Sequence, residues 1–99
     1  MMKILIAEDE IYARKSMKKQ IMELDFGREF HILEAQNGEQ GLALFRQEEP
    51  DLVFTDIRMP KMDGLELLRE IKREDPEAKV IMVSAYADFE YAKSAIKFE

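Results

Sequence analysis

The stretch DLVFTDIRMPKMDG, residues 51–64, decides the fold of this 99-residue chain. It opens with a short apolar run that ends in a carboxylate, Asp56. A turn around Pro60 follows, and Asp63 then stands before Gly64 in a good helix N-cap position. This order predicts a buried strand, a loop and an amphipathic helix, with a carboxylate at the carboxyl end of the strand.

The same alternation of short apolar runs and longer amphipathic stretches extends along the whole chain. Strands are expected at residues 3–7, 30–35, 51–56 and 79–84. A helix is expected after each strand. Gly27 is the expected C-cap of the first helix, and Asn37 and Gly38 form a turn or the N-cap of the second, which must end before Pro50. Asp88 is the expected cap of the fourth helix. Strands that are apolar on both faces and separated by helices predict an α/β fold with a parallel sheet covered on both sides.

Residue spacing also predicts which sides of the helices face the sheet. The apolar residues expected to face inward, at least in part, are Ile11, Met17, Ile21 and Leu24 in the first helix and Leu65, Leu67, Leu68 and Ile71 in the third. The basic residues Arg14, Lys15, Lys18 and Lys19 are expected to form a solvated face of the first helix.

Composition restricts the class of protein. The chain is 46% hydrophobic and 36% charged, which indicates one globular domain over residues 1–99. Its net charge of −6 argues against unaided binding to nucleic acid or to an anionic membrane. It has no cysteine, which excludes disulfides and thiolate chemistry, and no apolar run long enough to cross a membrane. We therefore expect a cytoplasmic protein.

The carboxylates suggest a specific chemistry. Glu8 and Asp9 follow the first expected strand, Asp56 ends the third, and the hydroxyl of Ser84 ends the fourth. Parallel sheets present ligand sites at the carboxyl ends of their strands. Three converging negative charges need a cation or a proton, and oxygen ligands favour a hard cation such as Mg²⁺. A carboxylate beside Mg²⁺ can attack phosphorus and form an acyl phosphate.

Each of these residues also has a plainer interpretation. Acids after a strand commonly cap the following helix, a lone Asp at a strand end is more often a turn residue, and Ser84 alone suits a loop or a cap. The convergence of three acids and one hydroxyl at the same end of three strands favours a functional site.

Three blocks of the sequence, residues 4–10, 56–64 and 80–85, together resemble the receiver domains of two-component response regulators. The resemblance implies a flavodoxin-like, doubly wound parallel sheet with strand order 2-1-3-4 for the four βα units present. It also implies a signalling domain rather than an enzyme, in which a sensor histidine kinase phosphorylates Asp56. Asp9 would bind Mg²⁺ directly and Glu8 through water, with Asp56 and the backbone carbonyl of Arg58 as further ligands. Ser84 would hydrogen-bond the phosphoryl group and move on phosphorylation.

The chain also departs from the pattern of that family. A fifth strand with its aromatic residue is not found after residue 84. The lysine that pairs with the phosphoryl group is not found either, because Lys93 and Lys97 fall within the expected fourth helix. We therefore expect a receiver truncated at its C-terminus, without an output domain and impaired in phosphorylation. Residues 84–92 are similar to receivers of helix-turn-helix transcriptional regulators, but no direct nucleic acid binding is expected. The fourth strand, left at the edge of the sheet, predicts self-association through that edge or by exchange of elements.

Two other functions compete with this interpretation. Phosphotransferases and phosphatases of the haloacid-dehalogenase type also use an aspartyl nucleophile with Mg²⁺, but they need a second Asp two residues later, where this chain has Arg58. A receiver-like scaffold that is never phosphorylated, and acts through interaction or self-assembly, is the alternative function for this chain.

Overall fold

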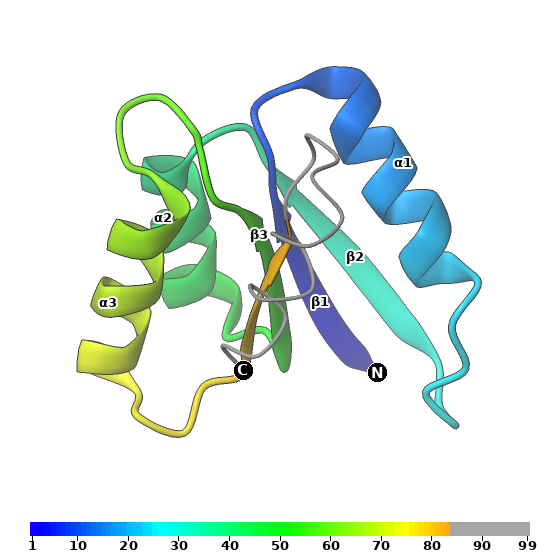
Figure 1. Cartoon of the computed structure of the whole chain (residues 1–99). Helices are drawn as coiled ribbons and strands as arrows, with labels where there is room; N and C mark the ends of the chain where they lie inside the picture. Colours follow the sequence, from blue (N-terminus) through cyan, green and yellow to red (C-terminus); the bar gives the residue numbers. More distant parts are fainter. Residues whose placement is uncertain (84–99) are drawn as a thin grey trace.

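The computed structural model describes residues 1–83, which form an alternating series of strands and helices (Figure 1). The elements are β1 (Met2–Ala7), α1 (Ile11–Met22), β2 (Phe30–Ala35), α2 (Gly38–Glu48), β3 (Leu52–Asp56), α3 (Gly64–Glu74) and β4 (Val80–Val83). The four described strands pair in parallel in the order β2-β1-β3-β4, as predicted. Ser84 and the helix expected after Asp88 lie outside the described residues.

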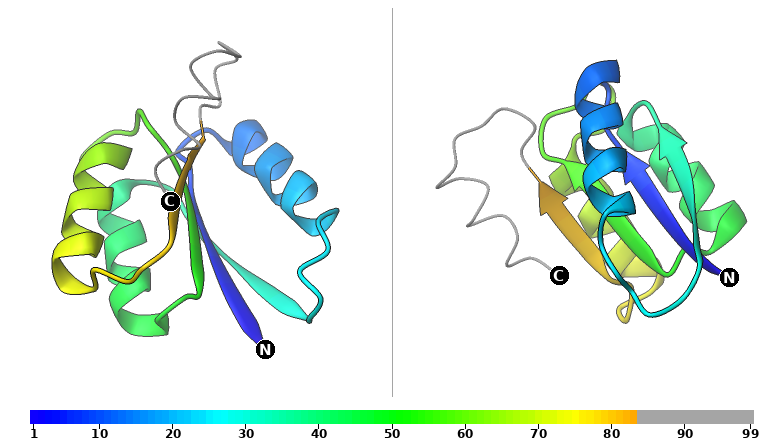
Figure 2. Two further views of the ribbon diagram at one scale, coloured as in Figure 1. Left: turned by 60° about the horizontal axis from the view of Figure 1, so that its bottom comes forward. Right: turned by 90° about the vertical axis from the view of Figure 1, so that its right-hand side faces the viewer.

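Helices lie on both faces of the sheet, with α2 and α3 on one face and α1 on the other (Figures 1 and 2). Along β1, Leu5 belongs to the core under α2 and α3, whereas Ile4 and Ile6 belong to the core that includes Met17 and Ile21 of α1. The strand is therefore apolar at successive positions because each of its faces meets a helix layer. No helix in residues 1–83 is long and apolar enough to cross a membrane.

Two predicted helix caps are confirmed. The Asn37 side chain accepts a hydrogen bond from the N–H of Gln40 at 2.8 Å, so Asn37 is the N-cap of α2. The Asp63 side chain accepts one from the N–H of Glu66 at 2.9 Å at the start of α3. Each cap satisfies a backbone donor that the first turn of the helix leaves unpaired, and so fixes where the helix begins.

Three details of the helices differ from the prediction. Helix α1 ends at Met22 with Glu23 as its C-cap, and Gly27 lies in the following loop with a φ of 72°. Leu24 falls beyond the end of α1 and is 51% exposed. Leu65 is 41% exposed, because the buried positions of α3 are Leu67 and Ile71 and a residue two positions earlier points away from that face.

The prediction for α1 was also wrong about Ile11 and Arg14. Ile11 is exposed, whereas Arg14 is buried on the inward side of the helix together with Met17 and Ile21. Lys15 and Lys19 are exposed, as expected for a solvated face.

Candidate functional site

The pairing of β1 with β3 brings two carboxylates to one edge of the sheet. Ala7 is the register partner of Thr55 at the carboxyl ends of these neighbouring strands. Glu8 follows Ala7 and Asp56 follows Thr55 in the sequence, so both residues lie at this edge. The expectation that the first and third strands are neighbours is therefore confirmed.

Glu8, Asp9 and Asp56 form a compact acidic cluster. One carboxylate oxygen from each residue lies within 4.8 Å of the other two. Glu8 is 0% exposed and Asp56 is 1% exposed, whereas Asp9 is exposed to solvent. The set offers only oxygen donors and concentrates negative charge in a mostly buried place, which is the chemistry that Mg²⁺ or another hard divalent cation requires.

Neighbouring residues hydrogen-bond Asp56 at its carboxylate and at its backbone carbonyl. The N–H of Ile57 donates to Asp56 Oδ1 at 2.8 Å. On the other side, the Thr55 hydroxyl donates to the Asp56 carbonyl oxygen at 2.9 Å. Asp56 is thus a buried residue of β3 held by local hydrogen bonds, and the plainer interpretation of a turn residue is wrong for it.

Glu8 is the carboxyl group most perturbed by this environment. Its Oε2 accepts a hydrogen bond from the N–H of Glu10 at 3.1 Å, and its Oε1 is buried without an N–H or hydroxyl donor from the described residues. Burial raises the pKa of Glu8 to about 8, and a side-chain hydrogen bond with Asp9 and the negative charges of Asp56 and Asp9 act in the same direction. The Glu10 N–H opposes these effects. Without a cation, Glu8 is therefore mostly protonated at neutral pH.

The raised pKa of Glu8 predicts a pH-dependent stability of the metal-free chain. The folded chain binds the proton of Glu8 more tightly than the unfolded chain. Protonation of Glu8 therefore contributes fully to the free energy of unfolding below pH 4.5, and this contribution is lost as the pH rises to about 8. Glu8→Gln keeps a neutral side chain at every pH. In EDTA, urea unfolding followed by circular dichroism should show the variant more stable than the parent at pH 8, and nearly equal to it at pH 4.5.

Glu29→Gln is the matched control, because Glu29 is exposed in the loop before β2. Its pH dependence should follow that of the parent. The same stability difference between Glu8→Gln and the parent at both pH values would contradict the assignment of a perturbed carboxyl to Glu8.

The third acid of the first block has a different role. Glu10 is the N-cap of α1, and its carboxylate accepts hydrogen bonds from the N–H groups of Tyr12 at 3.2 Å and Ala13 at 2.7 Å. The capping interpretation is thus correct for Glu10, whereas Glu8 and Asp9 belong to the acidic cluster.

The loop after β3 approaches the site closely at Gly64. The N–H of Gly64 donates to the carbonyl oxygen of Ile57 at 2.8 Å, which closes the loop between β3 and α3. A Cβ atom at Gly64 would overlap the carbonyl oxygen of Asp56. Glycine is therefore required for the start of α3 to pass this close to the end of β3.

Two predicted site residues are not brought into the cluster by the described structure. Arg58 lies in the loop after β3 with its residue exposed, and the metal-binding role of its carbonyl stays a prediction. Ser84 lies outside the described residues, so its role stays a prediction as well.

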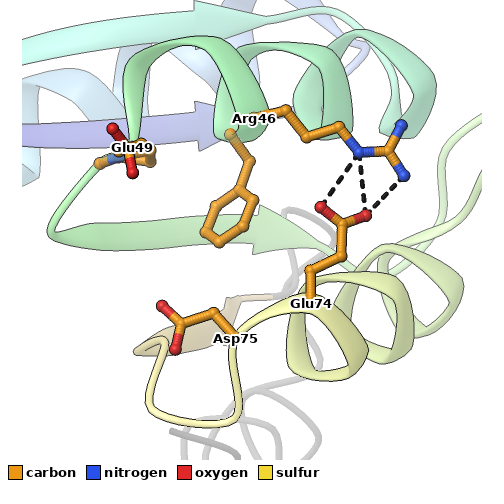
Figure 3. A pocket seen from close by; sticks show the side chains of 6 residues that line it. Arg46, Glu49, Glu74 and Asp75 are labelled. Carbon is orange, nitrogen blue, oxygen red and sulfur yellow. Dashed lines mark hydrogen bonds and ion pairs between the residues drawn. The ribbon is translucent and has the colours of Figure 1, made fainter.

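A separate cavity lies at the opposite end of the sheet (Figure 3). It has a volume of about 290 Å³ and is lined by residues at the ends of α2 and α3: Phe45, Arg46, Glu49, Pro50, Glu74 and Asp75. Arg46 Nε donates to Glu74 Oε2 at 2.9 Å, so the one cation among the lining residues in the described range 1–83 is already paired with an acid. This cavity contains none of the three clustered carboxylates.

Comparison with known proteins identifies the family. A family model described as the response regulator receiver domain matches residues 4–99. The chain belongs to this family. The receiver domain is 42% identical to a response regulatory protein of Staphylococcus epidermidis over 98% of this chain and 38% of that protein. It is 40% identical to the chemotaxis protein CheY of Listeria monocytogenes, over 98% of this chain and 79% of the relative.

Solved structures of receiver proteins share the fold. The response regulator TrrA from Thermotoga maritima, crystallised in complex with Mg²⁺ and BeF, matches with a TM-score of 0.77 and 35% identity. The match covers 92% of this chain and 76% of the TrrA chain. The receiver chain thus spans 38% of the length of its staphylococcal relative and most of the length of the CheY and TrrA chains.

Proposed function

We propose that this receiver domain is the phosphoacceptor of a two-component system, and that Asp56 accepts a phosphoryl group from a sensor histidine kinase in the cytoplasm. The observation that carries the proposal is the buried convergence of Glu8, Asp9 and Asp56 at the carboxyl ends of β1 and β3. Three acidic residues without a binding function would be expected at the surface, where water stabilises their charge, but the carboxyl groups of Glu8 and Asp56 are buried.

The proposed cofactor is Mg²⁺, held by Asp9, Glu8 and Asp56. Mg²⁺ would neutralise the acidic cluster and the charge of the incoming phosphoryl oxygens. A bound cation would favour the ionised form of Glu8, so this carboxyl would give up its proton to the solvent. The Mg²⁺ complex of the TrrA relative supports this choice of metal.

The chain's own contribution to the transfer is the positioned nucleophile. The Ile57 N–H donates to Asp56 Oδ1, which restricts the rotation of the carboxylate. A carboxylate oxygen of Asp56 forms a bond to phosphorus while the bond from phosphorus to the kinase imidazole nitrogen breaks. The electron pair of that bond leaves with the imidazole, and Asp56 becomes an acyl phosphate.

Acetyl phosphate provides a test that needs no kinase. After incubation of the chain with acetyl phosphate and Mg²⁺, intact mass spectrometry should detect one phosphoryl group per chain, formed slowly and absent in EDTA. The absence of any adduct on a chain that is folded by circular dichroism would contradict the phosphoacceptor function. That result would favour the scaffold function, in which the receiver acts by interaction or self-assembly without phosphorylation.

We also propose that the chain forms homo-oligomers through β4 or by exchange of elements. Within residues 1–83, β4 pairs only with β3, on one side, and its Ile81 and Val83 are half-buried. An apolar edge strand is a template for pairing with another chain, and a charge on it blocks that pairing. Sedimentation velocity at increasing concentration should show dimers that Ile81→Lys removes, and a monomer at all concentrations would contradict the proposal.

A further inference from the structure

Arg14 is the one basic residue of α1 that is buried. Its residue is 9% exposed, whereas Lys15 and Lys19 on the same helix are exposed. A buried guanidinium needs partners for its donors, since an unpaired buried charge is strongly destabilising. The partners of Arg14 therefore indicate why the sequence places an arginine at an inward position of the helix.

The guanidinium of Arg14 connects the loop after β1 to the edge strand β2. Arg14 Nη1 donates to the backbone carbonyl oxygen of Glu8 at 2.9 Å, in a buried hydrogen bond. Arg14 Nε donates to Glu34 Oε1 at 3.2 Å, and Lys18 holds the other oxygen of Glu34 at 3.3 Å. Arginine suits this position because its planar group directs two donors to two acceptors at once.

These contacts act on the backbone that carries two of the clustered acids. The N–H of Glu8 donates to the carbonyl oxygen of Ala35 in β2 at 3.0 Å. With Arg14 on its carbonyl, Glu8 is held by hydrogen bonds at both of its backbone polar groups. The carbonyl of Glu8 belongs to the peptide plane that it shares with Asp9, so the contact with Arg14 also limits how that plane can rotate.

We propose that Arg14 is a positioning residue for the cation site, which fixes the Glu8–Asp9 peptide against Glu34 of β2 and so determines where these two carboxylates lie. The inference rests on the proposed Mg²⁺ site. Arg14 does not touch the three clustered carboxylate groups and acts on them only through the backbone. Residues that orient metal ligands in this indirect way change metal affinity by about 10–100-fold when they are replaced.

Calorimetric titration with Mg²⁺ tests the role of Arg14. Arg14→Gln and Arg14→Lys should each bind Mg²⁺ about 10–100-fold more weakly than the parent. The lysine variant keeps the positive charge but cannot direct two N–H donors from one planar group. A loss of Mg²⁺ affinity in both variants therefore assigns the effect to the geometry of the guanidinium. Arg14 variants that bind Mg²⁺ as tightly as the parent would overturn the proposal.

Two matched controls separate positioning from a general loss of ion pairs. Lys18→Gln removes the other partner of Glu34 and leaves the bond from Arg14 to the Glu8 carbonyl in place. Arg46→Gln breaks an Arg–Glu pair at the opposite end of the sheet. Both controls should keep the Mg²⁺ affinity within about twofold of the parent, as expected for exposed ion pairs.

Amide hydrogen exchange in EDTA tests the positioning role without the metal. In Arg14→Gln, the amides of Glu8 and Glu10 should exchange at least several-fold faster, because the first donates to Ala35 and the second to the Glu8 carboxylate. The amide of Val53, which donates to Lys79 at the other end of the sheet, should keep its protection. Equal acceleration at all three amides would reduce Arg14 to a general structural residue and overturn the proposal.

The two measurements also distinguish this proposal from the proposed function. A parent chain that binds no Mg²⁺ contradicts the cation site itself, whereas local acceleration at Glu8 and Glu10 would still support backbone positioning by Arg14. If the parent and Arg14→Gln bind Mg²⁺ with equal affinity, the proposed phosphoacceptor function stands and the positioning role of Arg14 is overturned.

Discussion

Asp56→Asn is expected to abolish the phosphoryl adduct formed with acetyl phosphate and Mg²⁺. The substitution keeps the size and planar shape of the side chain, so the hydrogen bond from the Ile57 N–H can persist on the amide oxygen. It removes the negative charge and the nucleophilic oxygen that would attack phosphorus. Intact mass spectrometry should therefore show only unmodified chain, while circular dichroism remains that of the parent.

Asp51→Asn is the matched control for this experiment. Asp51 is exposed next to the opposite end of β3, where its side chain accepts a hydrogen bond from the N–H of Lys3 at 2.8 Å. This variant should be phosphorylated like the parent, which shows that loss of an aspartate beside β3 is not enough to prevent the reaction. An adduct that persists in Asp56→Asn would place the phosphoryl group on another residue, and peptide mapping would identify it.

Gly64→Ala is expected to destabilise the fold strongly. The added methyl group would overlap the carbonyl oxygen of Asp56 and lie about 3.0 Å from the Cα of Ile57. Both neighbours are backbone atoms, so the clash cannot be relieved by a side-chain rotation. Moving the start of α3 away would break the bond from the Gly64 N–H to Ile57. We expect the free energy of unfolding to fall by about 3 kcal/mol or more, which is a large part of the stability of a small domain.

Gly41→Ala provides the comparison for Gly64→Ala within the same molecule. Gly41 lies inside α2, and a methyl group there would meet the Leu67 side chain at 3.2 Å, which can shift slightly. Alanine also favours the helical state by up to about 1 kcal/mol over glycine, so this variant should unfold near the parent. Urea denaturation followed by circular dichroism measures both variants. Equal midpoints for Gly41→Ala and Gly64→Ala would contradict the requirement for glycine beside Asp56.

The central features of the fold and the site could be predicted from the sequence because they depend on simple patterns. A strand that is apolar on both faces and ends in a carboxylate needs only a parallel neighbour to place that carboxylate at a shared edge. β1 and β3 satisfy this condition, and Glu8, Asp9 and Asp56 meet as expected. The sequence could not predict that Glu10 caps α1 while Glu8 belongs to the acidic cluster, since the two glutamates differ in role only through backbone geometry.

The burial of Arg14 was not predicted, because a prediction from helical spacing places apolar residues on the inner face of a helix and charged residues on the outer face. A buried arginine is consistent with that spacing only if acceptors are present on the inner side, and those acceptors are the Glu8 carbonyl and the Glu34 side chain of β2. The separation of 20 residues between Arg14 and Glu34 carries no local signal. A polar residue one turn after Glu10, in line with Met17 and Ile21, was the one available hint.

The parallel pairing of β1 with β3 also determines when the acidic cluster can exist during folding. The pairing of Ala7 with Thr55 closes a loop of chain that includes α1, β2 and α2. Parallel pairings of this kind close long loops and form slowly compared with local helices. An unfolded chain therefore keeps Asp56 apart from the adjacent Glu8 and Asp9, and a cation that needs all three would bind the folded molecule alone. Such a cation shifts the folding equilibrium by mass action, so its concentration in the cell would contribute to how much of the protein is folded.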